Sequence, residues 1–320
     1  VIALAERGVV VTKKQEERLR EKREDFKRTN RETNLFAKNW QVNDTIKYPN
    51  LAATLRRIRY FGPKDFYTGH LAFSLAEFIQ DNGGIMSQED LANYTPVWRT
   101  PLTFQYDDLR IISMAPPSSG GICMAQVMTM IEPFDLDALG HNSVQAIQLL
   151  AEAERRSYAD RIFYLGDPDF VNIPIEELID TTYLNDRMSD FSFDAATDSK
   201  SMSYGSVEII ESDETTHYSI VDPFGNAVAV TTTLNSGYGS KLYCSELGFF
   251  LNNEMYDFSS KPGVPNLYGL VGSEANSILP EKRMLSSMTP TIVEKNNELY
   301  MVLGTPGGST IITSVLQTIV

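Results

Sequence analysis

Cysteine and histidine are both scarce in this chain, and their scarcity excludes several kinds of protein. The two cysteines, Cys123 and Cys244, are too few for a disulfide-dense scaffold, and Cys123 lies in an apolar helical pattern where a buried thiol is expected. The three histidines are His70, His141 and His217. Their spacing with cysteine and carboxylate side chains matches no metal-binding motif. We therefore expect neither a metal ion nor another cofactor.

Basic residues are also few, with 28 Lys and Arg against 42 Asp and Glu and a formal net charge of −14. This balance argues against nucleic-acid binding, which needs clustered cations. No run of about 18 apolar residues occurs, so no membrane span is expected. The chain has no signal-peptide pattern, but it starts at Val1 and ends inside the apolar run 311–320. Both ends are therefore predicted to be cuts through an element, which makes the missing targeting signal uninformative.

The apolar content is nevertheless large enough for a sizeable core, because 42% of the 320 residues are hydrophobic. Length alone favours about two domains, but no Gly/Ser-rich or Pro-rich linker divides the sequence. The predicted helices are 1–30, 51–60, 70–81, 122–131 and 144–163, and the predicted strands lie within 102–114, 216–222, 227–234, 248–253 and 298–303.

A predicted hairpin is the most informative stretch of the sequence. Its strands flank the turn 223–226, and a polar segment, 195–214, precedes it. A cut between Glu214 and Thr215 would place a threonine at a new chain end. Such a threonine carries its own base, because its α-amine has a pKa of about 8 and lies within reach of the hydroxyl. The alternative is an ordinary surface hairpin, which the local pattern alone favours because threonine is common in strands.

Several sequence blocks follow one another in order along nearly the whole chain. They are 116–121, 151–154, 158–161, 164–168, 215–219, 225–228, 233–235, 248–259, 261–266, 285–291 and 304–309. Together they closely resemble the γ-glutamyltranspeptidases (γ-glutamyltransferases, glutathione hydrolases). The resemblance implies an α/β (α+β) fold, the four-layer αββα sandwich of N-terminal-nucleophile hydrolases, incomplete here at both ends. Residues 1–214 would be the C-terminal part of a large subunit and 215–320 the N-terminal part of a small subunit, together one structural domain.

The resemblance also implies a self-processing enzyme that cleaves the γ-glutamyl amide of glutathione and related small molecules. Thr215 would attack the carbonyl of Glu214 to cut the precursor into a heterodimer, and would then attack the substrate. Thr233 would orient Thr215. A tetrahedral intermediate needs donors for its oxyanion, and the backbone N–H groups of Gly307 and Gly308 match the family's donors. Water or an amino acid would accept the γ-glutamyl group.

Substrate recognition is implied by the same resemblance. The α-ammonium requires acceptors, the α-carboxylate requires donors, and a loop at 262–283 would cover the pocket. A family arginine that binds the α-carboxylate would lie upstream of Val1. The matching residues are Asn235, Glu254 and Asp257 for the ammonium, Ser286 and Ser287 for the carboxylate, and Tyr268 as the shielding residue of the loop.

Alternatives remain. A related acylase for glutaryl-type side chains is disfavoured by the retained acids Glu254 and Asp257, and a non-catalytic binding relative by the intact threonines and glycines. A Ser-His-Asp hydrolase is weakened by the few histidines, although His217 points to the same side of its strand as Thr215. The loop 116–121 lacks the spacing of a phosphate loop, so a strand-to-helix turn is expected. Family habit alone implies a periplasmic or secreted protein.

Overall fold

The computed structural model describes residues 1–198, 215–259 and 273–320. They form two compact units, Val1–Val97 with Gly237–Asn253 and Trp98–Ser236 with Glu254–Val320. The predicted border between the two subunits, at 214/215, falls within the sequence span of the second unit. That border stays a prediction, as does the union of both subunits in one structural domain.

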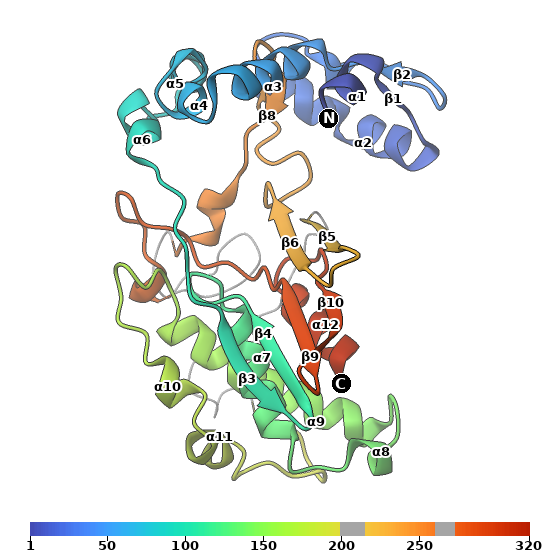
Figure 1. The fold of residues 1–320 in the computed structure, drawn as a ribbon, viewed down its shortest axis with the longest axis vertical. Helices are drawn as coiled ribbons and strands as arrows, with labels where there is room; N and C mark the ends of the chain where they lie inside the picture. The colour runs from blue at the N-terminus through green and yellow to red at the C-terminus, as the bar shows by residue number, and fades with distance from the viewer. Residues whose placement is uncertain (199–214, 260–272) are drawn as a thin grey trace. The chain divides into compact units, whose positions relative to one another are not determined.

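The first unit is mainly helical (Figure 1). The prediction of one helix over 1–30 is wrong, because Gly8 has a φ of 92° and the next two residues, β1 (Val9–Val10), pair with β2 (Thr45–Ile46). The helices are α1 (Ile2–Arg7), α2 (Lys13–Thr29), α3 (Pro49–Phe61), α4 (Lys64–Tyr67), α5 (His70–Asp81), α6 (Gln88–Asn93) and the 3-10 turn η1 (Leu35–Ala37), and a second strand pair is β7 (Tyr243–Cys244) with β8 (Phe249–Phe250).

A four-stranded antiparallel sheet, in the order β10-β9-β4-β3, lies in the second unit. The predicted hairpin is confirmed: β5 (Thr215–Val221) pairs with β6 (Ala227–Thr233) and packs against β9 and β10. The expected turn at 116–121 is confirmed too, since it joins β4 to α7. The other elements are β3 (Leu102–Tyr106), β4 (Leu109–Ser113), β9 (Thr291–Lys295), β10 (Glu298–Leu303), α7 (Gly120–Ile131), α8 (Leu136–Leu139), α9 (Val144–Tyr164), α10 (Ile175–Leu178), α11 (Thr181–Arg187), α12 (Thr310–Ile319), η2 (Glu254–Asp257) and η3 (Glu274–Asn276).

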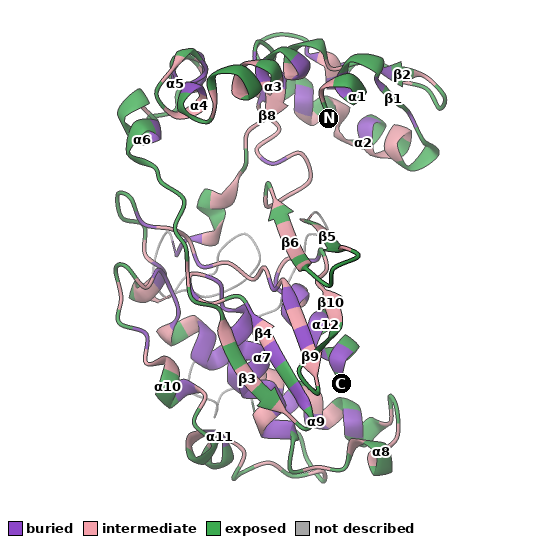
Figure 2. Cartoon of the chain, in the orientation of Figure 1, coloured by how far each residue is buried: buried purple, intermediate pink, exposed green. Residues whose placement is uncertain are grey.

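Helix α7 forms the centre of this unit's core and is buried over almost its whole length (Figure 2). A helix that is apolar on all sides needs apolar neighbours on all sides. Strands β3 and β4 contact it, as do helices α9, α11 and α12. The shared cluster includes Met128, Leu149, Val293 and Ile311. This layering of helices on a sheet confirms the predicted α+β class, although the sheets are small.

Two isoleucines in helices provide a matched test of this core. Ile131 of α7 is fully buried, whereas Ile147 of α9 is 54% exposed. In the full-length protein, we expect Ile131→Ala to lower the free energy of unfolding by about 2–5 kcal/mol through lost burial and a residual cavity. Ile147→Ala should change it by less than about 0.5 kcal/mol. Urea unfolding measures both, and equal effects would contradict the assigned core.

Candidate active site

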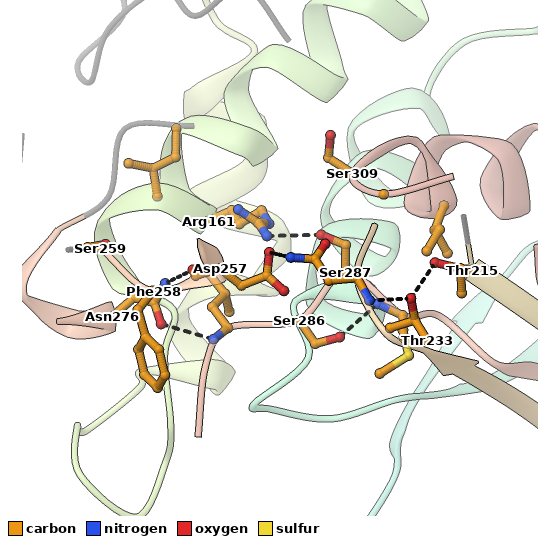
Figure 3. Close-up of a pocket in the computed structure, with 16 residues that line it drawn as sticks. Arg161, Thr215, Thr233, Asp257, Phe258, Ser259, Asn276, Ser286, Ser287 and Ser309 are labelled. Carbon is orange, nitrogen blue, oxygen red and sulfur yellow. Dashed lines mark hydrogen bonds between the residues drawn. The ribbon is translucent and has the colours of Figure 1, made fainter. Parts of the chain in front are cut away.

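A pocket of about 60 Å³ lies in the second unit, with walls from the hairpin, from α9, from the start of α12 and from the segments between these elements (Figure 3). A water-sized group needs about 10–15 Å³ of such space, so the pocket has room for a small polar ligand. The structure brings most of the predicted site residues together here. Those that line the pocket are Thr215, Thr233, Asn235, Asp257, Ser286, Ser287 and Gly308.

The two threonines face each other across the hairpin. Thr215 is the first residue of β5 and pairs in register with Thr233, the last residue of β6. Thr215 Oγ1 donates a hydrogen bond to Thr233 Oγ1 at 3.3 Å, and the backbone N–H of Asn235 donates to the same oxygen at 2.9 Å. The hydroxyl hydrogen of Thr215 therefore points toward Thr233. This bond leaves the lone pairs of Thr215 Oγ1 available to other partners.

An acidic wall lies beside the threonines. Asn235 Nδ2 donates to Asp257 Oδ1 at 3.2 Å. Asn276, a buried residue that the sequence reasoning missed, donates from Nδ2 to the Asp257 carbonyl at 2.7 Å and accepts from the Leu285 N–H at 2.9 Å. Asn276 thus links the segment that carries Asp257 to the segment that leads to Ser286 (Figure 3). No local pattern marks Asn276, because its two partners lie in other segments of the chain.

Asp257 of this wall and the nearby Glu254 both have raised pKa values. Burial raises the pKa of Glu254 to about 7 and the pKa of Asp257 to about 7. For Asp257 the charge of Glu254 adds to the rise, while the charge of Arg161 and the hydrogen bond from Asn235 oppose it. Glu254 is not among the residues that line the pocket, so it acts on the site through its charge. A cation that enters the pocket would favour the ionised forms of both acids.

A hydroxyl-rich wall faces the pocket from another side. Ser286 Oγ accepts from the Met288 N–H at 3.1 Å, and Ser287 Oγ accepts from Arg161 Nη2 at 3.0 Å. Arg161 is buried on α9 and was missed as a site residue. The sequence did contain a signal for it. Arg161 lies three positions after Tyr158, and residues at that spacing share a helix face, so the spacing places a charged residue on the core-facing side of the helix.

The glycine turn before α12 contributes Gly308 to the lining of the pocket. Gly307 has a φ of 136° and Gly308 a φ of 55°, which are left-handed conformations that favour glycine. The Gly307 carbonyl accepts from the N–H of Thr310 at 3.0 Å and from its hydroxyl at 2.6 Å, so the turn is fixed to the helix start. Within the described ranges, neither glycine N–H donates to a protein acceptor.

His217 is occupied by contacts along its own hairpin. Its Nδ1 lies 2.8 Å from Thr231 Oγ1 and its Nε2 lies 3.0 Å from Ser219 Oγ, which in turn donates to the Val302 carbonyl at 2.9 Å. Burial lowers its pKa, which favours the neutral ring. Where the structure describes the chain, hydroxyls rather than a carboxylate contact this ring, which disfavours a Ser-His-Asp triad.

Other sequence expectations have separate outcomes. Glu214 and Tyr268 lie outside the described residues, so the predicted cleavage and lid positions stay predictions. Both cysteines are buried, as expected for Cys123, and burial raises the pKa of the Cys123 thiol to about 11. Across residues 1–198, 215–259 and 273–320, no cluster of His, Cys, Asp or Glu is suited to a metal ion. In the same ranges, no helix combines the length and apolarity of a membrane span.

Comparison with known proteins identifies close relatives. The chain is 48% identical over 277 residues to the glutathione hydrolase proenzyme of Escherichia coli (strain K12), which covers 87% of this chain and 48% of that protein. It is 44% identical over 279 residues to the glutathione hydrolase proenzyme of Pseudomonas aeruginosa, with coverages of 87% and 49%. The chain thus spans about half the length of the curated relatives it matches.

Solved structures are similar in fold. The γ-glutamyltranspeptidase of Helicobacter pylori superimposes with a TM-score of 0.60 at 37% identity, covering 64% of this chain and 60% of that chain. A cephalosporin acylase from Bacillus halodurans gives 0.81 at 20% identity, covering 99% and 56%, and at that identity supports the fold alone. Both confirm the predicted α+β sandwich. The family described as gamma-glutamyltranspeptidase matches residues 1–320. The chain therefore belongs to the gamma-glutamyltranspeptidase family.

Proposed function

We propose that the protein containing this chain is a self-processing γ-glutamyltransferase and hydrolase of glutathione and related γ-glutamyl amides. The observation that carries the proposal is the position of Thr215. It begins a strand, its hydroxyl is hydrogen-bonded to Thr233, and it lines a pocket between an acidic wall and a hydroxyl-rich wall. These walls match the two charged groups of an amino acid. Family membership supports the same reaction.

The first reaction is cleavage of the precursor. Thr215 Oγ1 attacks the carbonyl carbon of Glu214, the C–N bond of that peptide breaks, and the acyl group moves from nitrogen to oxygen. Water then hydrolyses the ester, which leaves a carboxylate on Glu214 and a free amine on Thr215. That amine has a pKa of about 8, so a large fraction can act as a base near neutral pH. The products are a large and a small subunit that form a heterodimer.

In the second reaction, the hydroxyl of Thr215 attacks a substrate. The amine accepts the proton of Thr215 Oγ1, whose oxygen attacks the γ-carbonyl carbon of the substrate. The N–H groups of Gly307 and Gly308 stabilise the oxyanion, an effect of about 3–4 kcal/mol for each donor. The leaving amine takes the proton, and a γ-glutamyl ester remains on Thr215. Water or the amine of an amino acid then resolves the ester.

Recognition follows from charge. Asp257, Glu254 and Asn235 accept hydrogen bonds from the α-ammonium or favour its charge, and Ser286 and Ser287 donate to the α-carboxylate. In this proposal the loop 262–283, with Tyr268, covers the bound glutamyl group. The further arginine expected upstream of Val1 would complete the carboxylate site. A periplasmic or extracellular location agrees with family habit and belongs to the same proposal.

An acylase for glutaryl-type side chains is the second candidate, because a cephalosporin acylase has a similar fold. A glutaryl group has no α-ammonium, so the acidic wall would remain unpaired beside it. The perturbed acids Glu254 and Asp257 therefore favour the γ-glutamyl substrate. Cleavage of γ-glutamyl anilide in preference to glutaryl anilide would support the first candidate, and the reverse preference would support the acylase.

Processing can be tested on the full-length protein by a denaturing gel and N-terminal sequencing of the smaller band. We expect that band to begin at Thr215, with the sequence Thr-Thr-His-Tyr-Ser. Thr215→Ala should give one uncut chain, because it lacks the attacking oxygen. Thr216→Ala is the matched control, since Thr216 is exposed on the opposite side of the strand, and it should be cut. An uncut wild-type chain would contradict the proposal.

The pH dependence of specificity tests Asp257. Because its pKa is raised to about 7, it loses its charge as the pH falls through 7. We expect kcat/KM for γ-glutamyl anilide, divided by that for glutaryl anilide, to fall by about tenfold or more between pH 8 and pH 5.5. Dividing by the glutaryl value removes the titration of the Thr215 amine, which both substrates share. Asp257→Asn should lower this ratio and make it independent of pH. If the ratio in this variant keeps the wild-type pH profile, Asp257 is not the group whose titration causes it.

The same shift predicts a change in stability. The pKa of Asp257 is raised from 3.8, so its ionisation destabilises the unliganded protein as the pH rises from about 4 through 7. We expect Asp257→Asn to raise Tm by roughly 2–4 °C at pH 8, which corresponds to about 1 kcal/mol, and to have little effect at pH 4. Calorimetry at both pH values measures this difference, and a lower Tm at pH 8 would contradict it.

A further inference from the structure

Arg161 connects two segments of the pocket wall that are far apart in sequence. Its side chain reaches from α9, is 4% exposed, and has two different hydroxyl partners. Nε donates to Ser119 Oγ at 2.9 Å. Nη2 donates to Ser287 Oγ at 3.0 Å (Figure 3). The planar guanidinium can hold both hydroxyls at once, whereas the single ammonium of a lysine has no such fixed fork.

The turn at 116–121 also holds the segment 286–288, which carries Ser287. The Ser286 N–H donates to the Pro117 carbonyl at 2.9 Å, and the Ser286 carbonyl accepts from the N–H of Ser119 at 2.9 Å and from its Oγ at 2.8 Å. Ser118 Oγ donates to the Met288 carbonyl at 2.7 Å. The backbone of residues 286–288 is therefore fixed on one side by the turn. Arg161 adds a contact to the side chain of Ser287.

The donor and acceptor directions determine what Ser287 can offer a ligand. A guanidinium has donors only, so Ser287 Oγ is the acceptor in its bond to Arg161. A serine hydroxyl also has one hydrogen to donate, and Ser287 lines the pocket. The contact with Arg161 thus occupies a lone pair of Ser287 and leaves its O–H as a donor toward the pocket. The chemical group that fits such a donor beside a buried cation is an anionic oxygen.

We propose that Arg161 is a positioning residue that makes Ser287 a hydrogen-bond donor for the α-carboxylate of the substrate. This inference rests on the proposed function and names a determinant of its specificity. In this arrangement Arg161 acts through Ser287 rather than on the reacting atoms. The pocket then has a cation on the carboxylate side and the acids Asp257 and Glu254 on the ammonium side, which complements a zwitterionic amino-acid head.

A double-mutant cycle in the full-length processed enzyme tests the proposal with γ-glutamyl anilide. We expect Arg161→Gln to lower kcat/KM by about 10- to 100-fold, mainly through KM, which is the range for losing hydrogen bonds to a charged group. Ser287→Ala should give a similar loss. In the Ser287→Ala background, Arg161→Gln should cost less than about threefold further. The full loss in both backgrounds would overturn the proposal.

A comparison of two substrates gives a second test, because a purely structural role of Arg161 would not change the ratio of their kcat/KM values. Glutaryl anilide keeps the carboxylate, whereas γ-aminobutyryl anilide lacks it. For Arg161→Gln, kcat/KM should fall with the first and change by less than about threefold with the second. Equal losses on both substrates would overturn the proposal. Arg161→Lys keeps the charge but not the fork, and should recover only part of the loss, which also keeps the test usable if Arg161→Gln does not fold.

Arg187→Gln is the matched control. Arg187 forms an ion pair with Asp160 of α9 at 3.2 Å and donates to the Arg156 carbonyl at 2.9 Å, but it does not line the pocket. This variant should lower Tm and leave the substrate ratio unchanged. Failure of the proposed function would differ from failure of this inference. If the proposed function fails, the wild-type enzyme will not cleave γ-glutamyl anilide. If only this inference fails, the wild type will cleave it, and Arg161→Gln will keep the wild-type ratio of kcat/KM for glutaryl anilide to that for γ-aminobutyryl anilide.

Discussion

The register of one hairpin is the constraint on which the candidate site depends. Side chains alternate along a strand, so a slip by one residue would turn Thr215 to the other face. The turn at the far end holds the register: Asp222 Oδ1 accepts from the N–H groups of Phe224 and Asn226 at 2.9 Å each, and Asn226 Nδ2 donates to Asp222 Oδ2 at 2.7 Å. These short-range bonds determine that Thr215 meets Thr233 at the open end of the hairpin.

The buried helix α7 provides the rigid base for the rest of the pocket. It packs against α9, which carries Arg161, and against α12, which follows the glycine turn at Gly307. The turn at 116–121, which leads into α7, hydrogen-bonds the segment that holds Ser286. Three walls of the pocket are therefore attached to elements of one apolar core. Such attachment limits the freedom of side chains that must keep a fixed geometry.

The pocket combines features that would each destabilise an ordinary core. Burial raises the pKa values of Glu254 and Asp257 to about 7, so their ionised forms are disfavoured in the unliganded protein. Arg161 is buried and donates to two hydroxyls, which are neutral and do not cancel its charge. A ligand with one cation and one anion would compensate both walls. Departures from a favourable core of this kind are typical of functional sites.

Much of this architecture is determined by local sequence. Apolar periodicity predicted α7 and α9, alternation predicted the hairpin, and its turn residues account for the facing positions of Thr215 and Thr233. The same methods joined α1 and α2 into one helix, because the pairing of Val9–Val10 with Thr45–Ile46 involves a distant segment. The family resemblance, too, came from the sequence blocks between residues 116 and 309, without any knowledge of the fold.

Only the tertiary structure decided the parts of the site that depend on distant contacts. Arg161 and Ser287 lie 126 positions apart, and no periodicity within α9 identifies that partner. Asn276 joins the segments of Asp257 and Leu285 in the same way. The raised pKa values depend on how much of the chain buries each carboxylate, which is a property of the folded protein. The sequence thus determined the elements and pointed to Thr215 as the candidate nucleophile, whereas packing decided which charges surround that residue, because electrostatic and hydrogen-bond partners are set by proximity in space.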